Sequence, residues 1–175
     1  MDFKQTIFST MFLQGFLLFI ILLRSIHASR LTNCQQKQTS VMQACSPPWL
    51  AFRNHCYLYV IEKKKFLDAE QHCTEFSTPT RPAHLVSIAD SEEQDFLFHY
   101  ARAIYGQNYW IGYTDMAHNG KFVWTDGSSG NFGKWNGGEP NNSEGPKNCA
   151  FVKTINVWDD VGCHRKYSFI CKMMM

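Results

Sequence analysis

The chain has 175 residues, of which 17 are Lys or Arg and 15 are Asp or Glu, so its formal net charge is only +2. This near balance excludes the strongly basic surface typical of nucleic-acid binding and leaves no acidic tail. The length fits one domain with one hydrophobic core, and the content of 5 Trp, 7 Tyr and 14 Phe is typical of a compact, loop-rich extracellular fold.

Residues 1–28 have the organisation of a secretory signal peptide, with a weak positive start, an apolar core at residues 11–23 and a small-residue exit at Ala28-Ser29. The alternative is a signal anchor, because the apolar stretch counted over residues 6–23 approaches the ~18 residues of a membrane span. Polar residues dilute that longer stretch. We therefore expect cleavage, secretion and no membrane span in the mature chain.

Residues 29–44 form a polar linker ahead of a domain at residues 45–172, which leaves residues 173–175 as a tail. The linker contains Cys34, the odd one of 7 cysteines, in a stretch with little to bury. In an oxidising compartment this thiol favours an interchain disulfide, and with it a disulfide-linked homodimer. The alternative is a capped or unpaired thiol.

Apolar periodicity predicts two helices. Residues 63–76 carry apolar side chains at a helical repeat, with the charged residues 62–65 as a solvated start. Ser91 and Gln94 have the spacing of a capping box and would begin a second helix that runs to Ile104.

Short runs rich in aromatic and β-branched residues predict strands. These runs lie at residues 49–60, 84–88, 109–112, 122–124, 149–153 and 167–171. Between two of them, residues 125–148 are dense in Gly, Asn, Ser and Pro. A loop of this length inside a compact domain is usually functional.

The other six cysteines predict intrachain disulfides, although their spacing alone does not fix the connectivity. One pair is close enough to join a hairpin, a second brackets the end of the long loop, and the third would link the start of the domain to its end. The favoured pairs are Cys45–Cys56, Cys149–Cys163 and Cys73–Cys171. Zinc is not expected, because the chain has neither a Cys-x-x-Cys nor a His-Glu-x-x-His motif.

Hard oxygen donors are concentrated in two short segments near the end of the chain. Glu139 and Asn141 flank a proline, and Asp159 and Asp160 closely precede Cys163. Carboxylate and amide oxygens gathered in this way suit Ca2+, which takes about six to eight oxygen ligands in irregular geometry. A cis peptide bond before the proline would turn both of its neighbours toward one spot. These residues therefore predict a calcium site on a loop that a disulfide clamps.

A series of aromatic and polar motifs runs in a fixed order through residues 45–172. The motifs are Cys45-x-x-x-Trp49, Cys56-Tyr57, Trp110-Ile111-Gly112, Trp124-Thr125-Asp126-Gly127, Trp135, Glu139-Pro140-Asn141, Trp158-Asp159-Asp160 and Phe169-Ile170-Cys171. Together with the cysteines, this series resembles the C-type lectin domain. Its many matched spacings make the resemblance specific.

The resemblance implies an α+β fold with two helices, two small antiparallel sheets, a long calcium-binding loop and the three disulfides favoured above. It also implies that Glu139, Asn141 and Asp160 hold Ca2+, and that two vicinal sugar hydroxyls complete the coordination. In this family the Glu-Pro-Asn motif is associated with mannose, N-acetylglucosamine and fucose. Glycans with equatorial vicinal hydroxyls are therefore the expected partners.

Two positions depart from the family pattern. Lys147 stands where a second Glu is usual, and Asp159 stands where Asn is usual. An ammonium cannot ligate Ca2+, so one ligand is lost unless Glu144 replaces it. Asp159 can still ligate but cannot donate to a sugar hydroxyl, a role that Lys147 could take. We expect a working site in which Glu139, Asn141, Lys147 and Asp159 contact the sugar.

The auxiliary calcium site that is common in the family is not expected here. Asp115 is kept, but amides and Lys147 stand where several acids are usual. The only glycosylation sequon, at residues 141–143, includes a predicted ligand. We therefore expect that sequon to stay unmodified.

No nucleophile, base and orienting group come together in the sequence, so an enzyme is not expected. The tryptophans are expected to be core or loop anchors rather than sugar platforms. The expected function is calcium-dependent carbohydrate binding by a secreted lectin, in glycan recognition or innate defence. The alternative is a lectin-like domain that binds a protein or mineral surface without calcium-dependent sugar binding, and Lys147 is its best support.

Overall fold

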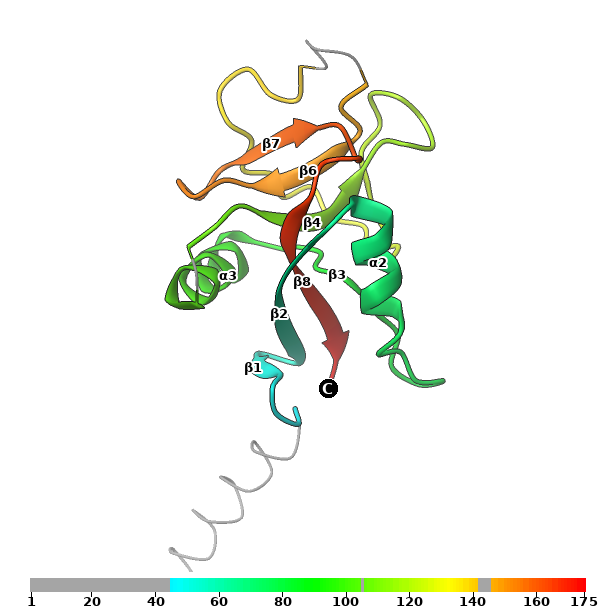
Figure 1. Ribbon diagram of the computed structural model, residues 1–175, viewed down its shortest axis with the longest axis vertical. Helices are drawn as coiled ribbons and strands as arrows, with labels where there is room; N and C mark the ends of the chain where they lie inside the picture. The colour runs from blue at the N-terminus through cyan, green and yellow to red at the C-terminus, as the bar shows by residue number, and fades with distance from the viewer. Residues whose placement is uncertain (1–44, 105, 142–145) are drawn as a thin grey trace, which may run out of the picture. The chain divides into compact units, whose positions relative to one another are not determined.

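The computed structural model describes residues 45–104, 106–141 and 146–175 (Figure 1). The predicted signal peptide, the linker with Cys34 and the loop residues 142–145 lie outside these ranges, so what was expected of them stays a prediction. The chain divides into residues 1–44 and a second unit, Cys45–Met175, and the fold is that of the second unit.

Two helices and eight strands make up the described part of the chain. The helices are α2 (Phe66–Thr74) and α3 (Ser91–Ile104). The strands are β1 (Leu50–Phe52), β2 (His55–Lys64), β3 (Ala83–Leu85), β4 (Tyr109–Thr114), β5 (Val123–Trp124), β6 (Cys149–Val152), β7 (Trp158–Val161) and β8 (Tyr167–Met174). The predicted α+β class with two helices is confirmed. Neither of these helices has the length and apolar character needed to traverse a bilayer.

The strands form one continuous sheet in the order β1-β2-β8-β4-β6-β7, to which β3 is added beside β8 and β5 beside β4. All strand pairings are antiparallel except that of β4 with β8, where Tyr109 lies opposite Ser168 and Trp110 opposite Phe169. The two small antiparallel sheets that were expected are therefore two halves of one sheet, joined by this parallel pairing. In Figure 1, β1, β2 and β8 form the lower half, and β6 and β7 lie at the upper end.

Two hydrophobic clusters pack on the two faces of strand β4, because successive side chains of a strand point to opposite faces. Tyr109 and Ile111 belong to the cluster that contains Leu97 of α3, whereas Trp110 belongs to the cluster that contains Phe66 of α2. Figure 1 shows α3 and α2 on opposite sides of β2 and β8. Each helix therefore covers one face of the sheet.

The close packing of β4 explains a glycine in the middle of this strand. A Cβ atom at Gly112 would lie 2.8 Å from the carbonyl oxygen of Leu85 and 2.6 Å from Oγ1 of Thr125. In addition, the amide of Gly112 donates to the carbonyl of Val86 at 2.9 Å. Only a residue without a side chain permits this approach of two backbones.

The capping box of helix α3 differs from the sequence prediction. Asp90, rather than Ser91, accepts the backbone N–H of Glu93 at 2.9 Å, and the Glu93 carboxylate accepts the backbone N–H of Ala89 at 2.8 Å. The predicted pair is thus displaced by one residue. Gln94 is fully buried and points into the domain instead of capping the helix.

Three other predictions are corrected. Residues 62–64 belong to strand β2 rather than to a solvated helix start, and α2 begins only at Phe66. Residues 158–161, which were treated only as ligand-bearing, form strand β7 beside β6. The expected tail is largely sheet, because Met173 and Met174 pair with Cys56 and His55 of β2.

The three disulfides have the predicted connectivity. Sulfur–sulfur bonds join Cys45 to Cys56, Cys73 to Cys171 and Cys149 to Cys163. The tryptophan prediction is also confirmed for Trp110, Trp124 and Trp158, which are buried in the core.

Candidate metal centre

Trp158, the first residue of β7, holds the long loop against the sheet. Its backbone N–H donates to the carbonyl of Lys134 at 2.7 Å, and its own carbonyl accepts the N–H of Asn136 at 2.8 Å. The Trp135 and Trp158 rings also meet edge to face, with centroids 5.7 Å apart. The loop is therefore fixed three residues before Glu139, next to the strand that carries Asp159 and Asp160.

A tight turn then directs the chain back toward β7. The N–H of Glu139 donates to the carbonyl of Asn136 at 3.0 Å, and Gly138 has a left-handed φ of 87°. Glycine adopts this φ without the steric penalty that a side chain brings. The peptide bond between Glu139 and Pro140 is cis, as expected from the sequence.

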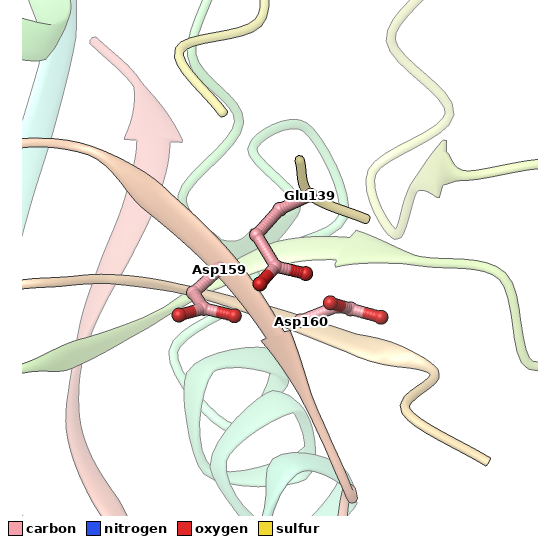
Figure 2. A group of neighbouring side chains, drawn as sticks. All are labelled: Glu139, Asp159 and Asp160. Atoms are coloured by element: carbon pink, nitrogen blue, oxygen red, sulfur yellow. The ribbon is translucent and has the colours of Figure 1, made fainter. Parts of the chain in front are cut away.

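Three of the four predicted metal ligands come together in space. One carboxylate oxygen from each of Glu139, Asp159 and Asp160 lies within 4.8 Å of the others. Figure 2 shows Glu139 reaching from the loop toward the two aspartates of β7. Asp160 is 2% exposed, whereas Asp159 and Glu139 are half-buried. The long loop supplies Glu139 and strand β7 supplies the two aspartates, so pairing of these two segments assembles the cluster.

The carboxylate of Glu139 is in an unfavourable environment for a negative charge. Burial, contact with Asp160 and the charge of Asp159 raise the pKa of Glu139 above its ordinary value. Its Oε2 atom is buried and has no hydrogen-bond partner among the described residues. A buried carboxylate oxygen without a donor is costly unless a cation compensates it.

The fourth predicted ligand, Asn141, completes the group. Its Nδ2 donates to Oε1 of Glu139 at 2.8 Å, and its backbone N–H lies 3.4 Å from Oδ1 of Asp160. Its amide oxygen accepts from Nζ of Lys147 at 3.3 Å. Carboxylate and amide oxygens of this kind fit a hard cation such as Ca2+.

Lys153 is a member of the site that sequence reasoning missed. Its Nζ forms an ion pair with Oδ2 of Asp159 at 3.0 Å. Lys153 follows β6, and Asp159 lies opposite Phe151 in the β6–β7 ladder. Lys153 and Asp159 are six residues apart on either side of a turn. Opposite charges at this spacing in a hairpin could have predicted the ion pair.

Asp115, the one acid kept from the auxiliary-site pattern, has a structural role. It is fully buried, its Oδ2 accepts the N–H of Gly120 at 2.7 Å, and its Oδ1 accepts from Nδ2 of Asn148 at 2.8 Å. These contacts join the loop after β4 to the residue before β6. Asp115 therefore supports the loops around the site.

Comparison with known proteins defines the class of this domain. The family model for the lectin C-type domain matches residues 62–173. C-type lectin domain family 4 member G of Homo sapiens is 34% identical over 155 residues, which cover 86% of this chain and 48% of that protein. The alpha-N-acetylgalactosamine-specific lectin of Patiria pectinifera is 35% identical over 134 residues, which cover 73% of this chain and 79% of that protein.

A solved structure agrees with these relatives. The crystal structure of the C-type lectin CEL-I from Cucumaria echinata matches with a TM-score of 0.72 at 30% identity, covering 74% of this chain and 97% of that chain. The chain therefore belongs to the C-type lectin domain family, whose members are binding proteins rather than enzymes and generally bind Ca2+. It spans about half the length of the human relative.

Proposed function

We propose that this protein is a secreted, calcium-dependent lectin that binds glycans of the mannose, N-acetylglucosamine or fucose type. The observation that carries the proposal is the convergence of Glu139, Asp159 and Asp160, with a buried Glu139 oxygen that lacks a donor. Membership in the C-type lectin domain family supports carbohydrate as the ligand class. A role in glycan recognition or innate defence follows from secretion and this specificity.

Glu139, Asn141, Asp159 and Asp160 would hold Ca2+, which when bound supplies coordination to two vicinal sugar hydroxyls. The chain's own side chains then discriminate between sugars. A carboxylate such as Glu139 accepts a hydrogen bond from a hydroxyl, and the Nδ2 group of Asn141 donates one. Because donor and acceptor are fixed by the turn and by β7, equatorial vicinal hydroxyls satisfy both, while an axial hydroxyl leaves one buried group unpaired.

The position of Lys147 is consistent with a second sugar donor. Its ammonium lies on Asn141, 3.3 Å from the amide oxygen. Asp159 cannot donate to a hydroxyl, and Lys147 is the side chain at the rim of the site that can replace the donor that Asn usually supplies. Glu144, the candidate replacement for the lost ligand, lies outside the described residues.

Calorimetric titration of Ca2+ into the protein, with and without mannose, tests the calcium-dependent function. We expect saturable calcium binding that tightens in the presence of mannose, because the sugar completes the coordination. Absence of calcium binding at millimolar concentration would contradict the proposal.

The specificity rule is tested by the double change Glu139→Gln with Asn141→Asp. This change exchanges an acceptor for a donor on one side of the site and a donor for an acceptor on the other. We expect preference to move from mannose toward galactose in competitive elution from a sugar matrix. An unchanged preference would contradict this assignment. The alpha-N-acetylgalactosamine named for the Patiria pectinifera relative makes galactose-type sugars the necessary comparison.

A second function is supported by the two lysines at the site. Ion pairing of Lys153 with Asp159 and the contact of Lys147 with Asn141 favour a lectin-like domain that binds a protein or mineral surface without calcium-dependent sugar binding. Absence of retention on a mannose matrix in the presence of calcium would favour this function. Calcium-dependent elution favours the lectin.

We also propose a disulfide-linked homodimer through Cys34, since two heads would raise the avidity of a weak single site. Nonreducing gel electrophoresis of the secreted protein should show a dimer that the change Cys34→Ser converts to monomer. A monomer in the unmodified protein would contradict this assembly.

A further inference from the structure

The acidic cluster of this site is compensated by cationic side chains from two directions. On one side, Nζ of Lys153 lies 3.0 Å from Oδ2 of Asp159. On the other side, Nζ of Lys147 lies 3.3 Å from the amide oxygen of Asn141, and Nδ2 of the same Asn141 donates to Oε1 of Glu139. Two ammonium groups thus face a cluster of three carboxylates.

We propose that Lys147 is an internal counter-cation of this site, which occupies the cation-binding oxygen of Asn141 when calcium is absent and must leave it before Ca2+ can bind. The ammonium is bonded to an atom that would itself be a calcium ligand. A monovalent side chain and a divalent ion compete for the same oxygen, so calcium binding is a displacement rather than the filling of a prepared cavity.

The electrostatics support this assignment. The positive charge of Lys147 lies next to the Asn141 side chain that donates to Glu139, so it attracts the carboxylates across the cluster. The contact between Lys147 and Asn141 is exposed to solvent. Lys147 is half-buried, and its long side chain can change rotamer while its backbone stays in place. The lysine therefore weakens calcium binding without abolishing it.

The role of Lys147 as a counter-cation rests on the proposed function. It predicts a different calcium affinity from the simple absence of a ligand at position 147. If Lys147 acts only as a missing Glu, then removal of its charge changes nothing and only a new carboxylate restores affinity. If it acts as a counter-cation, then removal of its charge alone tightens calcium binding.

The experiment compares four variants in calcium titrations followed by terbium luminescence and calorimetry. Lys147→Gln and Lys147→Met both remove the charge, but only Gln brings an amide oxygen that could ligate Ca2+, so a gain in affinity that both variants share is due to the charge. Lys147→Arg keeps the charge. Lys63→Gln, at an exposed position of β2 outside the site, is the control for a general change in net charge. We expect Lys147→Gln to bind Ca2+ roughly tenfold more tightly than the unmodified protein, because a unit charge no longer repels a divalent ion at short range. Lys147→Arg and Lys63→Gln should match the unmodified protein.

A calcium-free readout accompanies the titration. In the presence of a chelator, Lys147→Gln should unfold at a lower temperature than the unmodified protein and Lys147→Arg, since the carboxylates lose a neutralising charge. Equal calcium affinity in Lys147→Gln and the unmodified protein would overturn the inference, even if both bind mannose. Calcium binding by Lys147→Gln alone would support the inference and at the same time contradict the proposed function of the natural chain.

Discussion

The indole Nε1–H of Trp158 donates to Oε1 of Gln94 at 2.7 Å, and this bond connects helix α3 to the strand that carries both site aspartates. Both side chains are completely buried. Gln94 also donates from Nε2 to Oδ1 of Asn156 at 2.7 Å, so one amide holds the β6–β7 turn and the start of β7. The position of the acidic cluster therefore depends on Gln94, although helix α3 contributes none of the predicted metal ligands.

The change Gln94→Ala should lower the free energy of unfolding by about 1–3 kcal/mol, because it leaves the Trp158 indole without a buried acceptor. Calcium affinity should fall as well, since β7 loses its connection to α3. Urea unfolding and calcium titration measure the two effects. The matched control Gln107→Ala, at an exposed position, should change stability by less than about 0.5 kcal/mol. Equal effects of the two changes would contradict this role of Gln94.

The free energy of unfolding of the calcium-free protein should depend on pH because the ionised Glu139 carboxylate destabilises the folded state. Burial and the neighbouring aspartates raise the pKa of Glu139 above its ordinary value, so the folded protein binds this proton more tightly than the unfolded chain does. The resulting stabilisation is complete below the unfolded pKa and is lost as pH rises through the folded pKa. Glu139→Gln should therefore be more stable than the unmodified protein at pH ~7, and the difference should shrink as pH falls toward the ordinary pKa.

Urea unfolding in the presence of a chelator, repeated across this pH range, measures the effect. The control for a general loss of one negative charge is Glu75→Gln, which removes an exposed carboxylate at the end of α2. If Glu139→Gln proves less stable than the unmodified protein at neutral pH without calcium, then the ionised carboxylate does not destabilise the folded state and the prediction is wrong.

Removal of the Cys149–Cys163 disulfide should loosen the hairpin that carries the aspartates. The bond closes a sequence separation of 14 residues, for which the chain-entropy model gives about 3 kcal/mol. The double change to alanine should lower the free energy of unfolding by about that amount and weaken calcium binding. Removal of Cys73–Cys171, with a separation of 98 residues, should cost about 4–5 kcal/mol in the same model. The reverse ranking in urea unfolding would argue against this account.

The tight contact at Gly112 predicts a large effect of a single methyl group. Gly112→Ala would place Cβ against the Leu85 carbonyl and should destabilise the protein by about 1–3 kcal/mol in thermal or urea unfolding. Gly137→Ala is the matched control, because its Cβ would meet no atom within 4 Å. A comparable loss in the two variants would show that glycine at position 112 serves another purpose.

The parts of the fold that follow from local patterns were predictable. The helices repeat apolar residues at a helical spacing, and two of the three cysteine pairs, Cys45–Cys56 and Cys149–Cys163, lie close in the chain. The acidic ligands were also predictable, because Glu139, Asn141, Asp159 and Asp160 are concentrated in two segments joined by one disulfide. The Cys149–Cys163 disulfide holds the end of the long loop next to the hairpin that carries the aspartates, so ligands that are close in the chain are also close in the fold.

Other features depend on contacts between distant residues, which no local pattern reveals. Gln94 reads as a capping residue, yet burial against Trp158, 64 residues away, decides its role. Strand β7 was missed because Asp159 and Asp160 are consecutive acids, which break the alternation of polar and apolar residues expected of a strand. The parallel pairing of β4 with β8 likewise joins segments that are more than fifty residues apart in the chain.

The two ends of the described domain meet at one edge of the sheet. The N–H of Met175 donates to the carbonyl of Asn54 at 3.1 Å, and Cys45 is bonded to Cys56 of the neighbouring strand β2. In the strand order, β1 and β7 are the two outermost members, and Figure 1 shows them at opposite ends of the domain. A label, bead or sensor surface attached at either end of the domain would therefore hold it by the edge opposite β7. Such immobilisation leaves the acidic cluster facing the solution, which suits surface-based measurement of glycan binding.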